Sequence, residues 1–264
     1  MKAKVTGVVV LFCLAFGVAR AQVFIGPVAG GSFSWSSFGD KDLKDAYKLK
    51  PVWGYHAGAQ LTFRVRKRFF LHTSILYATK GKVLEGKNEE LELKARYNYI
   101  DVPIIYTVHF KGNIGKKPFT YFLGIGPDVS YWLGGKGSIE NTDTHEFGEN
   151  GSVVDYKVVF YKDPDQAGEN EMVVKKPNRV QLGLNLTAGL AFEPARDREM
   201  FLTFRYELGH SFLSRETNGA FKPTYFEDPM NIRNHGFRIS LAYMIDLKIE
   251  QRKKGKSTIK KNKM

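Results

Sequence analysis

The chain has 264 residues, of which 43% are hydrophobic and 25% are charged, and its formal net charge is +13. Three of these positive charges lie in residues 1–21 and a net seven in residues 248–264, which leaves +3 for the rest. A basic nucleic-acid-binding surface is therefore not expected in the main part of the chain. The only cysteine, Cys13, lies in the N-terminal apolar run, so residues 22–264 form no disulfide.

The N-terminus has the pattern of a secretory signal peptide. Lys2 and Lys4 precede an apolar run from Val5 to Val18, and Ala19-Arg20-Ala21 follows as a cleavage site. The alternative, a retained transmembrane helix, needs roughly 20 apolar residues. No later stretch is long and apolar enough for a spanning helix. The expected division is a signal peptide at 1–21, one β-domain at 22–247 and a basic tail at 248–264.

Residues 22–247 show repeated two-residue alternation, which predicts strands with one apolar face. The clearest case is Val52–Arg64, where Trp53, Tyr55 and Leu61 alternate with His56 and Gln60. Eight such strands are predicted: Val23–Trp35, Val52–Arg64, Phe69–Lys80, Ala95–Phe110, Phe119–Leu133, Arg179–Phe192, Met200–Ser214 and His235–Leu247.

The connections between these strands alternate between long and short. Residues 36–51, 81–94 and 134–178 are expected to be long polar loops, whereas the turns after the second, fourth and sixth strands are short. This pattern predicts an all-β fold, an eight-stranded antiparallel up-and-down transmembrane β-barrel with short periplasmic turns and long external loops. The connection after the seventh strand is also expected to be long. Within 134–178, Val153–Tyr161 is strand-like, and either an external hairpin arm or an additional pair of barrel strands would fit.

Aromatic residues near the strand ends are expected to form girdles at the two membrane interfaces. They are Trp35, Trp53, Tyr55, Phe69, Phe70, Tyr77, Tyr97, Phe119, Tyr131, Trp132 and Phe192. The alternative fold is a secreted lipocalin-like barrel whose apolar face surrounds a soluble ligand. The polar faces are rich in Gly, Ala, Ser and Thr, which suits a narrow lumen better than a solvent-exposed surface.

Several segments resemble the PorT-like outer-membrane β-barrel family of Bacteroidota. The paired segments Tyr99–Ile105 and Pro118–Pro127 carry the resemblance, and Asn185–Phe192, Arg205–Gly209 and Asn234–Leu241 are similar to the closing strands of that family. The resemblance implies an eight-stranded barrel in the cell outer membrane. It also implies, as an expectation, an accessory role in type IX protein secretion and gliding.

Charged residues fall on the polar face of several predicted strands and are expected to meet in the lumen. They are Asp101, Asp128, Arg205, Glu207 and Arg238. Charges in a narrow lumen must pair or be hydrated, so a polar plug is the leading interpretation, and a gated pore or a catalytic acid pair is the alternative. His56, His72 and His109 are also expected to face the lumen.

No catalytic, cofactor or metal site is expected. The sequence contains no G-x-S-x-G elbow and no ligand spacing typical of a metal site. The leading functional hypothesis is a non-enzymatic outer-membrane protein that belongs to an envelope assembly; an outer-membrane lipid-modifying enzyme is a weaker alternative. The expected partners are outer-membrane lipid and other proteins, reached through the external loops or through the tail Lys248–Met264, which is otherwise a solvated end.

Overall fold

A computed structural model describes residues 22–88, 90–114, 117–141, 153–160, 163, 166–195, 197–215, 218–221 and 227–247. The expected signal peptide at 1–21 and the expected tail at 248–264 lie outside these residues. Within the described ranges, none of the helical segments has the length and apolarity needed to cross a membrane.

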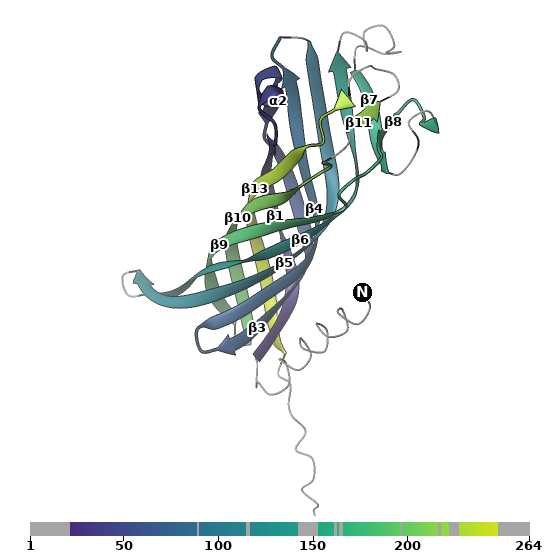
Figure 1. The fold of residues 1–264 in the computed structure, drawn as a ribbon. Coiled ribbons are helices and arrows are strands. Elements are labelled where there is room, and N and C mark those ends of the chain that lie inside the picture. Colours follow the sequence, from purple (N-terminus) through teal and green to yellow (C-terminus); the bar gives the residue numbers. More distant parts are fainter. Residues whose placement is uncertain are drawn as a thin grey trace, which may run out of the picture.

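Eight long strands form a closed ring (Figure 1). Each pairs antiparallel with the next one along the chain that belongs to the ring, and the first pairs with the last. The strands are β1 (Gln22–Phe38), β3 (Val52–Arg66), β4 (Phe69–Gly86), β5 (Leu91–Ile114), β6 (Lys117–Asn141), β9 (Val180–Ala195), β10 (Arg198–Phe212) and β13 (Ile232–Leu247). Every predicted strand thus corresponds to a member of the ring.

Shorter elements gather above the ring in the view of Figure 1. They are α2 (Lys41–Ala46), β2 (Tyr47–Lys50), β7 (Val153–Phe160), β8 (Glu171–Val174), β11 (Gly219–Phe221) and β12 (Glu227–Asp228). β7 pairs antiparallel with β6, β8 lies parallel to β7, and β11 and β12 continue the same sheet. Together with the ends of β4, β5 and β6 beyond the ring, these elements form what we call the upper lobe.

The expected loops at 36–51 and 81–94 are wrong, and so is the start of the loop expected at 134–178, because β6 continues to Asn141. β1 continues to Phe38, and a short helix follows whose N-cap Asp40 accepts a hydrogen bond from the Asp42 amide. β4 continues to Gly86 and β5 begins at Leu91, so only residues 87–90 connect them. In these extensions Leu84, Leu91 and Leu93 are buried, whereas Glu85, Glu92 and Lys94 alternate with them on the outer face. Because charged residues replace apolar ones on the outer face, the composition of these segments resembles that of a loop, and the prediction missed the strands.

The strand-like segment at 153–161 belongs to a hairpin arm. Its described part is β7, which pairs with Gly135–Glu140 at the upper end of β6 and takes no place in the ring. Inside the ring, β6 pairs instead with β9. Of the two interpretations of this segment, the external arm is therefore the one that the described residues match.

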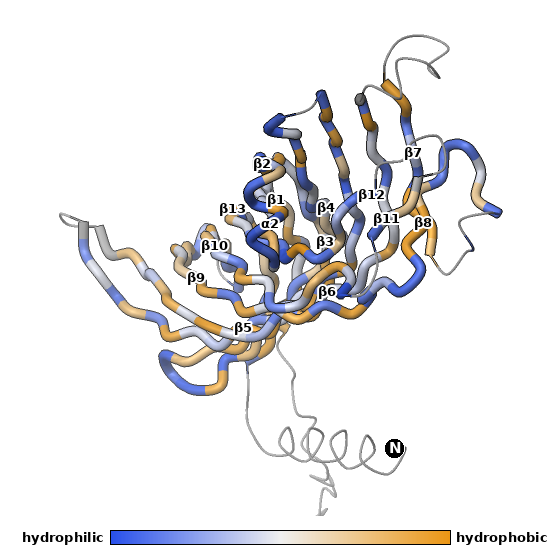
Figure 2. Tube along the Cα trace, turned by 45° about the horizontal axis from the view of Figure 1, so that its top comes forward, coloured by the Kyte–Doolittle hydropathy of each residue, from blue (hydrophilic) through white to orange (hydrophobic). Residues whose placement is uncertain are grey.

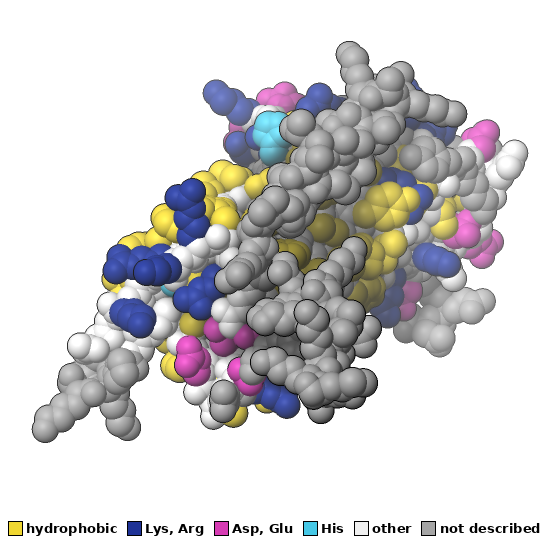
Figure 3. All heavy atoms as spheres, turned by 90° about the horizontal axis from the view of Figure 1, so that it is seen from below, with side chains coloured by type: hydrophobic (Ala, Val, Ile, Leu, Met, Phe, Trp, Pro, Cys, Tyr) yellow, Lys and Arg dark blue, Asp and Glu magenta, His cyan; other side chains and the backbone are white. Residues whose placement is uncertain are grey.

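A belt of exposed apolar side chains surrounds the ring. It includes Trp53, Tyr55, Ile75, Tyr77, Tyr121, Leu123, Ile125, Tyr131, Leu133, Leu182, Leu186, Phe204, Phe237, Ile239, Leu241 and Tyr243. The tube in Figure 2 shows the alternation of apolar and polar residues along these strands. Seen from below, hydrophobic side chains line the flank of the ring, and Lys and Arg side chains gather near its rim (Figure 3). Such an outer face is typical of strands that meet lipid.

Three aromatic residues expected in the girdles are buried inside instead. Phe70, Tyr97 and Trp132 are at most 5% exposed. Phe70 and Trp132 each follow an aromatic residue that faces outward, and neighbouring residues of a strand point to opposite faces. Tyr97 lies above the belt, where its ring packs on Trp132 at 5.2 Å between centroids. The position of an aromatic residue near a strand end therefore did not determine whether its side chain faces outward or into the lumen.

The interior of the ring is divided into layers. A lower apolar cluster contains Phe24, Val28, Phe70, Leu76, Phe122, Phe201, Ala242 and Met244. An upper apolar cluster extends into the upper lobe and includes Phe38, Leu93, Tyr97, Tyr99, Trp132, Tyr156, Met172, Leu213, Met230 and Ile232. Gly189 makes room in the lower layer, because a Cβ there would lie 2.2 Å from the Phe122 ring. Polar and charged residues lie between the two clusters.

The belt predicts a difference between two exposed apolar positions. Ile125 is 51% exposed at the middle of the belt on β6, whereas Val153 is 54% exposed on β7 of the upper lobe. Ile125→Arg should lower the free energy of unfolding of the protein in lipid vesicles by about 2–4 kcal/mol, because a charge at mid-bilayer depth is costly. Val153→Arg, the matched control, should cost less than about 1 kcal/mol. Guanidinium titrations in vesicles measure both, and equal losses would contradict a lipid-facing belt.

Candidate functional site

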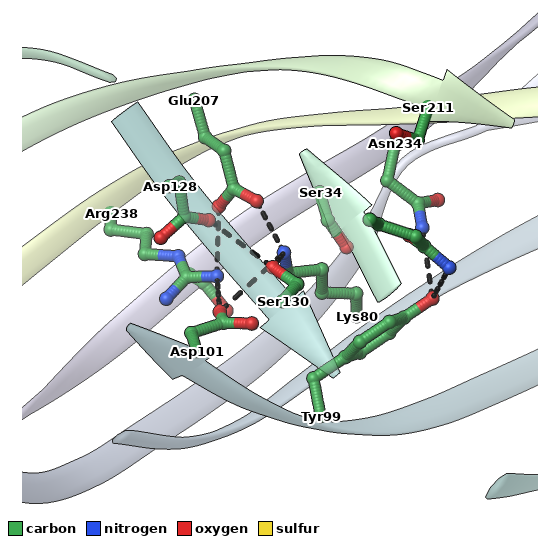
Figure 4. Close-up of polar contacts among 12 residues, drawn as sticks. Ser34, Lys80, Tyr99, Asp101, Asp128, Ser130, Glu207, Ser211, Asn234 and Arg238 are labelled. Carbon is green, nitrogen blue, oxygen red and sulfur yellow. Dashed lines mark hydrogen bonds and ion pairs between the residues drawn. The ribbon is translucent and has the colours of Figure 1, made fainter. Parts of the chain in front are cut away.

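Four charged side chains form an ion-paired cluster in the middle of the lumen (Figure 4). Arg238 on β13 pairs with Asp101 on β5 and, at 2.8 Å, with Glu207 on β10. Lys80 on β4 pairs with Glu207 and lies 3.4 Å from Asp101. All four side chains are at most 7% exposed. Each carboxylate therefore contacts both cations, and each cation contacts both carboxylates.

Asp128 and Arg205 lie beside this group. The Ser130 hydroxyl donates to Asp128 at 3.2 Å and accepts from the Lys80 ammonium at 3.1 Å, which links Asp128 to the cluster. Arg205 is 7% exposed and lies directly opposite Arg238 in the register of β10 and β13. In the part of the chain that the structure describes, Arg205 makes no ion pair, and its Nε has no hydrogen-bond partner.

The structure thus brings Asp101, Glu207 and Arg238 into direct contact. Asp128 is linked to them through the Ser130 hydroxyl and Lys80, and Arg205 lies beside them without an ion pair among the described residues. Sequence reasoning did not include Lys80 in this group, although the alternation of β4 placed it on the lumen face. A count of charges could have found it. Three carboxylates with only two arginines leave one negative charge unbalanced, and Lys80 restores neutrality.

A neutral hydrogen-bond network lies above the cluster. The Tyr99 hydroxyl accepts from Asn234 at 3.2 Å and from Gln181 at 3.5 Å, and Ser36 donates to Asn234 at 3.0 Å. The Tyr99 ring also faces the Lys80 ammonium, which lies 4.9 Å from the ring centroid. This network joins the charged layer to the upper apolar cluster.

The three histidines expected in the lumen are buried at two levels. His72 and His109 lie in the lower layer, where His109 stacks on Phe70 at 3.9 Å and on Phe122 at 5.0 Å between centroids. His72 is held between the hydroxyls of Thr62 and Thr107, each at 2.9 Å. These rings are packed as part of a core.

His56 forms a hydrogen bond with Ser240 that resembles half of a catalytic triad. Its Nε2 lies 2.7 Å from the Ser240 hydroxyl oxygen. A triad also needs an acid on the other ring nitrogen, but His56 Nδ1 has no partner among the described residues. His56 is 1% exposed, so a substrate does not reach this pair in the structure.

The carboxylates have a spacing that could suit a metal ion. One oxygen from each of Asp101, Asp128 and Glu207 lies within 4.8 Å of the others. Lys80 and Arg238 already lie against the oxygens of Asp101 and Glu207 and supply the positive charge that a cation would provide. A divalent ion would have to displace these cations and be repelled by them. The residues therefore do not fit a metal site.

A second buried ion pair lies in the upper lobe. The Lys82 ammonium donates to Asp228 at 2.5 Å and to the Pro229 carbonyl at 3.1 Å, and both charged side chains are fully buried. Burial lowers the pKa of Lys82 and raises the pKa of Asp228, although their mutual attraction opposes both shifts. Each charged group therefore depends on the other to offset the cost of its burial.

The lumen geometry predicts unequal effects for two arginines at opposite register positions. Arg238→Met leaves Asp101 and Glu207 with Lys80 as their only charged partner and should destabilise the fold by about 3–5 kcal/mol. Arg205→Met, the matched control, breaks no ion pair and should cost less than half as much. Guanidinium titration of the refolded protein in detergent gives both values. Equal losses would show that Arg205 contributes as much to the cluster as Arg238.

The upper pair predicts a pH-dependent effect. Lys82→Met leaves the Asp228 carboxylate buried and unpaired, so it should destabilise the fold by about 3 kcal/mol at pH 8. The loss should be smaller at pH 5. A folded-state pKa raised above the unfolded value favours the protonated acid, so stability decreases as pH rises toward the folded pKa.

The double variant Lys82→Met/Asp228→Leu is the control for this prediction. It removes both charges and should return the stability to within about 1 kcal/mol of the wild-type value, with little dependence on pH. Unfolding titrations at the two pH values measure all three proteins. A single variant as stable as the wild type at pH 8 would show that the pair contributes nothing.

Comparison with known proteins gives one family match. No curated protein is similar enough in sequence to match the chain. Among solved structures, the chain is similar to Neisserial surface protein A, with 10% identity, 85% of this chain and 97% of that chain covered, and a TM-score of 0.35. It is also similar to Ail of Yersinia pestis, with 11% identity, 85% of this chain and 99% of that chain covered, and a TM-score of 0.36. For OprG from Pseudomonas aeruginosa the identity is 10%, the coverage is 86% of this chain and 93% of that chain, and the TM-score is 0.43. Similarity at this level says nothing about function.

The family match covers residues 19–211, nearly three quarters of the chain, and the model is described as outer membrane protein beta-barrel domain. The matched region includes six of the ring strands in full and all of the β10 residues that carry cluster charges. The chain therefore belongs to the outer membrane protein β-barrel domain family, and its place in the cell is the outer membrane.

Proposed function

We propose that the chain is a non-enzymatic, non-conducting up-and-down barrel that anchors its upper lobe at the cell surface as an accessory or structural part of an envelope assembly. In this proposal the short turns and both ends of the described chain face the periplasm. The upper lobe faces outward and, with the tail 248–264 on the other side, offers surfaces to other proteins. Type IX secretion and gliding is the assembly that the PorT-like resemblance favours.

The observation that carries this proposal is the filled lumen. A charge-balanced cluster crosses the ring from β4, β5 and β6 to β10 and β13. Apolar clusters close the lumen above and below it. An ion that entered would have to cross both apolar layers and break buried ion pairs, each of which is costly. A plugged barrel leaves its surfaces as the place where it acts.

The segments that resemble the PorT-like family carry the cluster residues. Asp101 lies in Tyr99–Ile105, Glu207 lies in Arg205–Gly209, and Arg238 lies in Asn234–Leu241. These motifs thus have a physical role in holding the barrel together. They support membership in a group of plugged barrels, whereas the link to type IX secretion depends on the resemblance.

Two other functions are less compatible with the structure. A lipocalin-like carrier needs an apolar cavity inside the barrel and a polar exterior, whereas this barrel has a charged interior and an apolar belt. A lipid-modifying enzyme needs a nucleophile that lipid can reach, whereas Ser240 and His56 are buried in the lumen.

The experiment combines purified protein with cells of the source bacterium. In planar bilayers the refolded full chain should show no ion conductance steps, because the lumen is closed. A strain lacking the chain should show a defect in type IX cargo secretion or gliding, and expression of Arg205→Met should restore it, since the cluster pairs stay intact. A heat-modifiability gel confirms that each protein is folded.

The outcomes separate the parts of the proposal. Regular conductance steps from the wild type would overturn the plugged lumen. Normal secretion and gliding in the deletion strain would overturn the type IX assignment. A change in the mass of outer-membrane lipids that follows expression of the chain would support the enzyme alternative and overturn the non-enzymatic role.

A further inference from the structure

Three cations stand directly opposite one another on the outer face of the upper lobe. Arg96 on β5 is the register partner of Lys136 on β6, and Lys136 is the register partner of Lys157 on β7. All three side chains are exposed. We call these three residues the cation row. Like charges directly opposite each other on adjacent strands destabilise a sheet, so the row needs an explanation.

The structure offsets the positive charge of the row only in part. No ion pair joins Arg96, Lys136 or Lys157 to an acid in the described ranges of the chain. Lys94, one row further up, pairs with Glu92 at 2.8 Å and so is already neutralised. Asp155 lies on the same face of β7 as Lys157, two residues away, and Glu171 on β8 is the register partner of Lys157, so two acids lie beside three cations. A net positive charge therefore stays on this part of the surface.

A cavity lies over the same strands. Its volume is about 540 Å³, and its lining includes the cation row together with Lys94, Ser138, Asn170 and one carboxylate, that of Asp155. These side chains provide ammonium, guanidinium, hydroxyl and amide groups, most of which are hydrogen-bond donors. A cavity of this size holds a group much larger than a water molecule. Several cations that converge on one space are the arrangement that binds phosphate.

The height of the row indicates where the phosphate comes from. Arg96 lies four residues beyond the half-buried Ile100, the register partner of the belt residue Tyr131, and Lys136 lies three residues beyond Leu133 of the belt. With a strand rise of about 3.3 Å per residue and a tilt of about 40°, the row lies roughly 10 Å above the belt. That is the level of lipid headgroups, beside the apolar surface that holds the acyl chains.

We propose that the cation row and its cavity bind the phosphate groups of a glycolipid headgroup in the outer leaflet. The lipid phosphates neutralise the three like charges, and the acyl chains of the same molecule lie against the belt below. The choice of leaflet rests on the proposed orientation, with the upper lobe outside the cell. The binding chemistry itself depends only on the row.

The test uses the full chain refolded in a non-ionic detergent, so binding does not depend on membrane orientation. The probes are bis-phosphorylated lipid A, the same lipid with its phosphates removed, and inorganic pyrophosphate, and binding is measured by thermophoresis. Wild type should bind the phosphorylated lipid at least 10-fold more tightly than either other probe. The variant Arg96→Gln/Lys136→Gln/Lys157→Gln should lose about 100-fold, since each cation near an anionic lipid contributes about a factor of five.

The matched control is Lys41→Gln/Lys44→Gln/Lys48→Gln, which removes the same charge from exposed lysines elsewhere in the upper lobe and should change the affinity less than about twofold. A second readout is stability without ligand. Lys136→Gln relieves two like-charge contacts, so it should raise the midpoint of unfolding while it weakens lipid binding. Replacement of a lysine with only a structural role would not raise the midpoint of unfolding and weaken lipid binding at the same time.

Several results would overturn the proposal. Equal binding of lipid A by the wild type and the triple variant would show that the row is not the site. Equal binding of phosphorylated and dephosphorylated lipid would show that phosphate is not recognised. Binding of pyrophosphate without lipid A would assign the site to a soluble anion. None of these results would bear on the plugged lumen or the role in an envelope assembly.

Discussion

The ion-paired cluster in the lumen is the constraint on which the rest of the barrel depends. Its four charged side chains come from β4, β5, β10 and β13, and Ser130 links Asp128 on β6 to them, so strands that are not neighbours in the ring meet through it. Arg238 is central, since its guanidinium contacts carboxylates from β5 and β10 at once. Because a charge in a narrow lumen needs an opposite charge close by, each member restricts the positions of the others. The cluster therefore specifies the register of the strands as well as filling the space between them.

The layers above and below the cluster follow from the same constraint. Buried ion pairs are stable only when water is excluded and their remaining hydrogen bonds are satisfied. The aromatic stack of Phe70, His109 and Phe122 closes the lower side, and Tyr99 with its amide donors covers the upper side. The upper apolar cluster then continues past the belt into the upper lobe. The lobe is thus continuous with the core of the barrel, and its position relative to the ring is set by packing.

Sequence alternation predicted the ring well because each face of these strands has one environment. Where lipid lies on one side and a narrow lumen on the other, period two is strict, and all eight ring strands were found. It failed above the belt, where both faces of β4 and β5 change environment. There Leu84 and Leu93 still point inward, but Glu85 and Glu92 replace apolar residues outside, and the segment has the composition of a loop.

The same limit applies to the site. The alternation of side chains along the strands was enough to place Asp101, Glu207 and Arg238 on the lumen face. It could not show that Arg205, at an equivalent position opposite Arg238, would have no carboxylate within reach, because that depends on the stagger between strands. Lys82 and Asp228 are 146 residues apart and meet only because the upper lobe folds over the ring. Long-range contacts of this kind leave no pattern in the sequence around either residue.

Two groups of like charges in the molecule show how burial decides their consequences. In the lumen, Arg205 and Arg238 lie opposite each other, but Asp101, Asp128 and Glu207 lie in the same layer and, with Lys80, make the layer as a whole neutral. In the cation row, Arg96, Lys136 and Lys157 are opposite one another on an exposed face, where Asp155 and Glu171 offset only part of their charge. Water and salt screen part of the repulsion, but it is not removed. The barrel neutralises its internal charges with its own residues, whereas the outer row needs an anion from the surroundings.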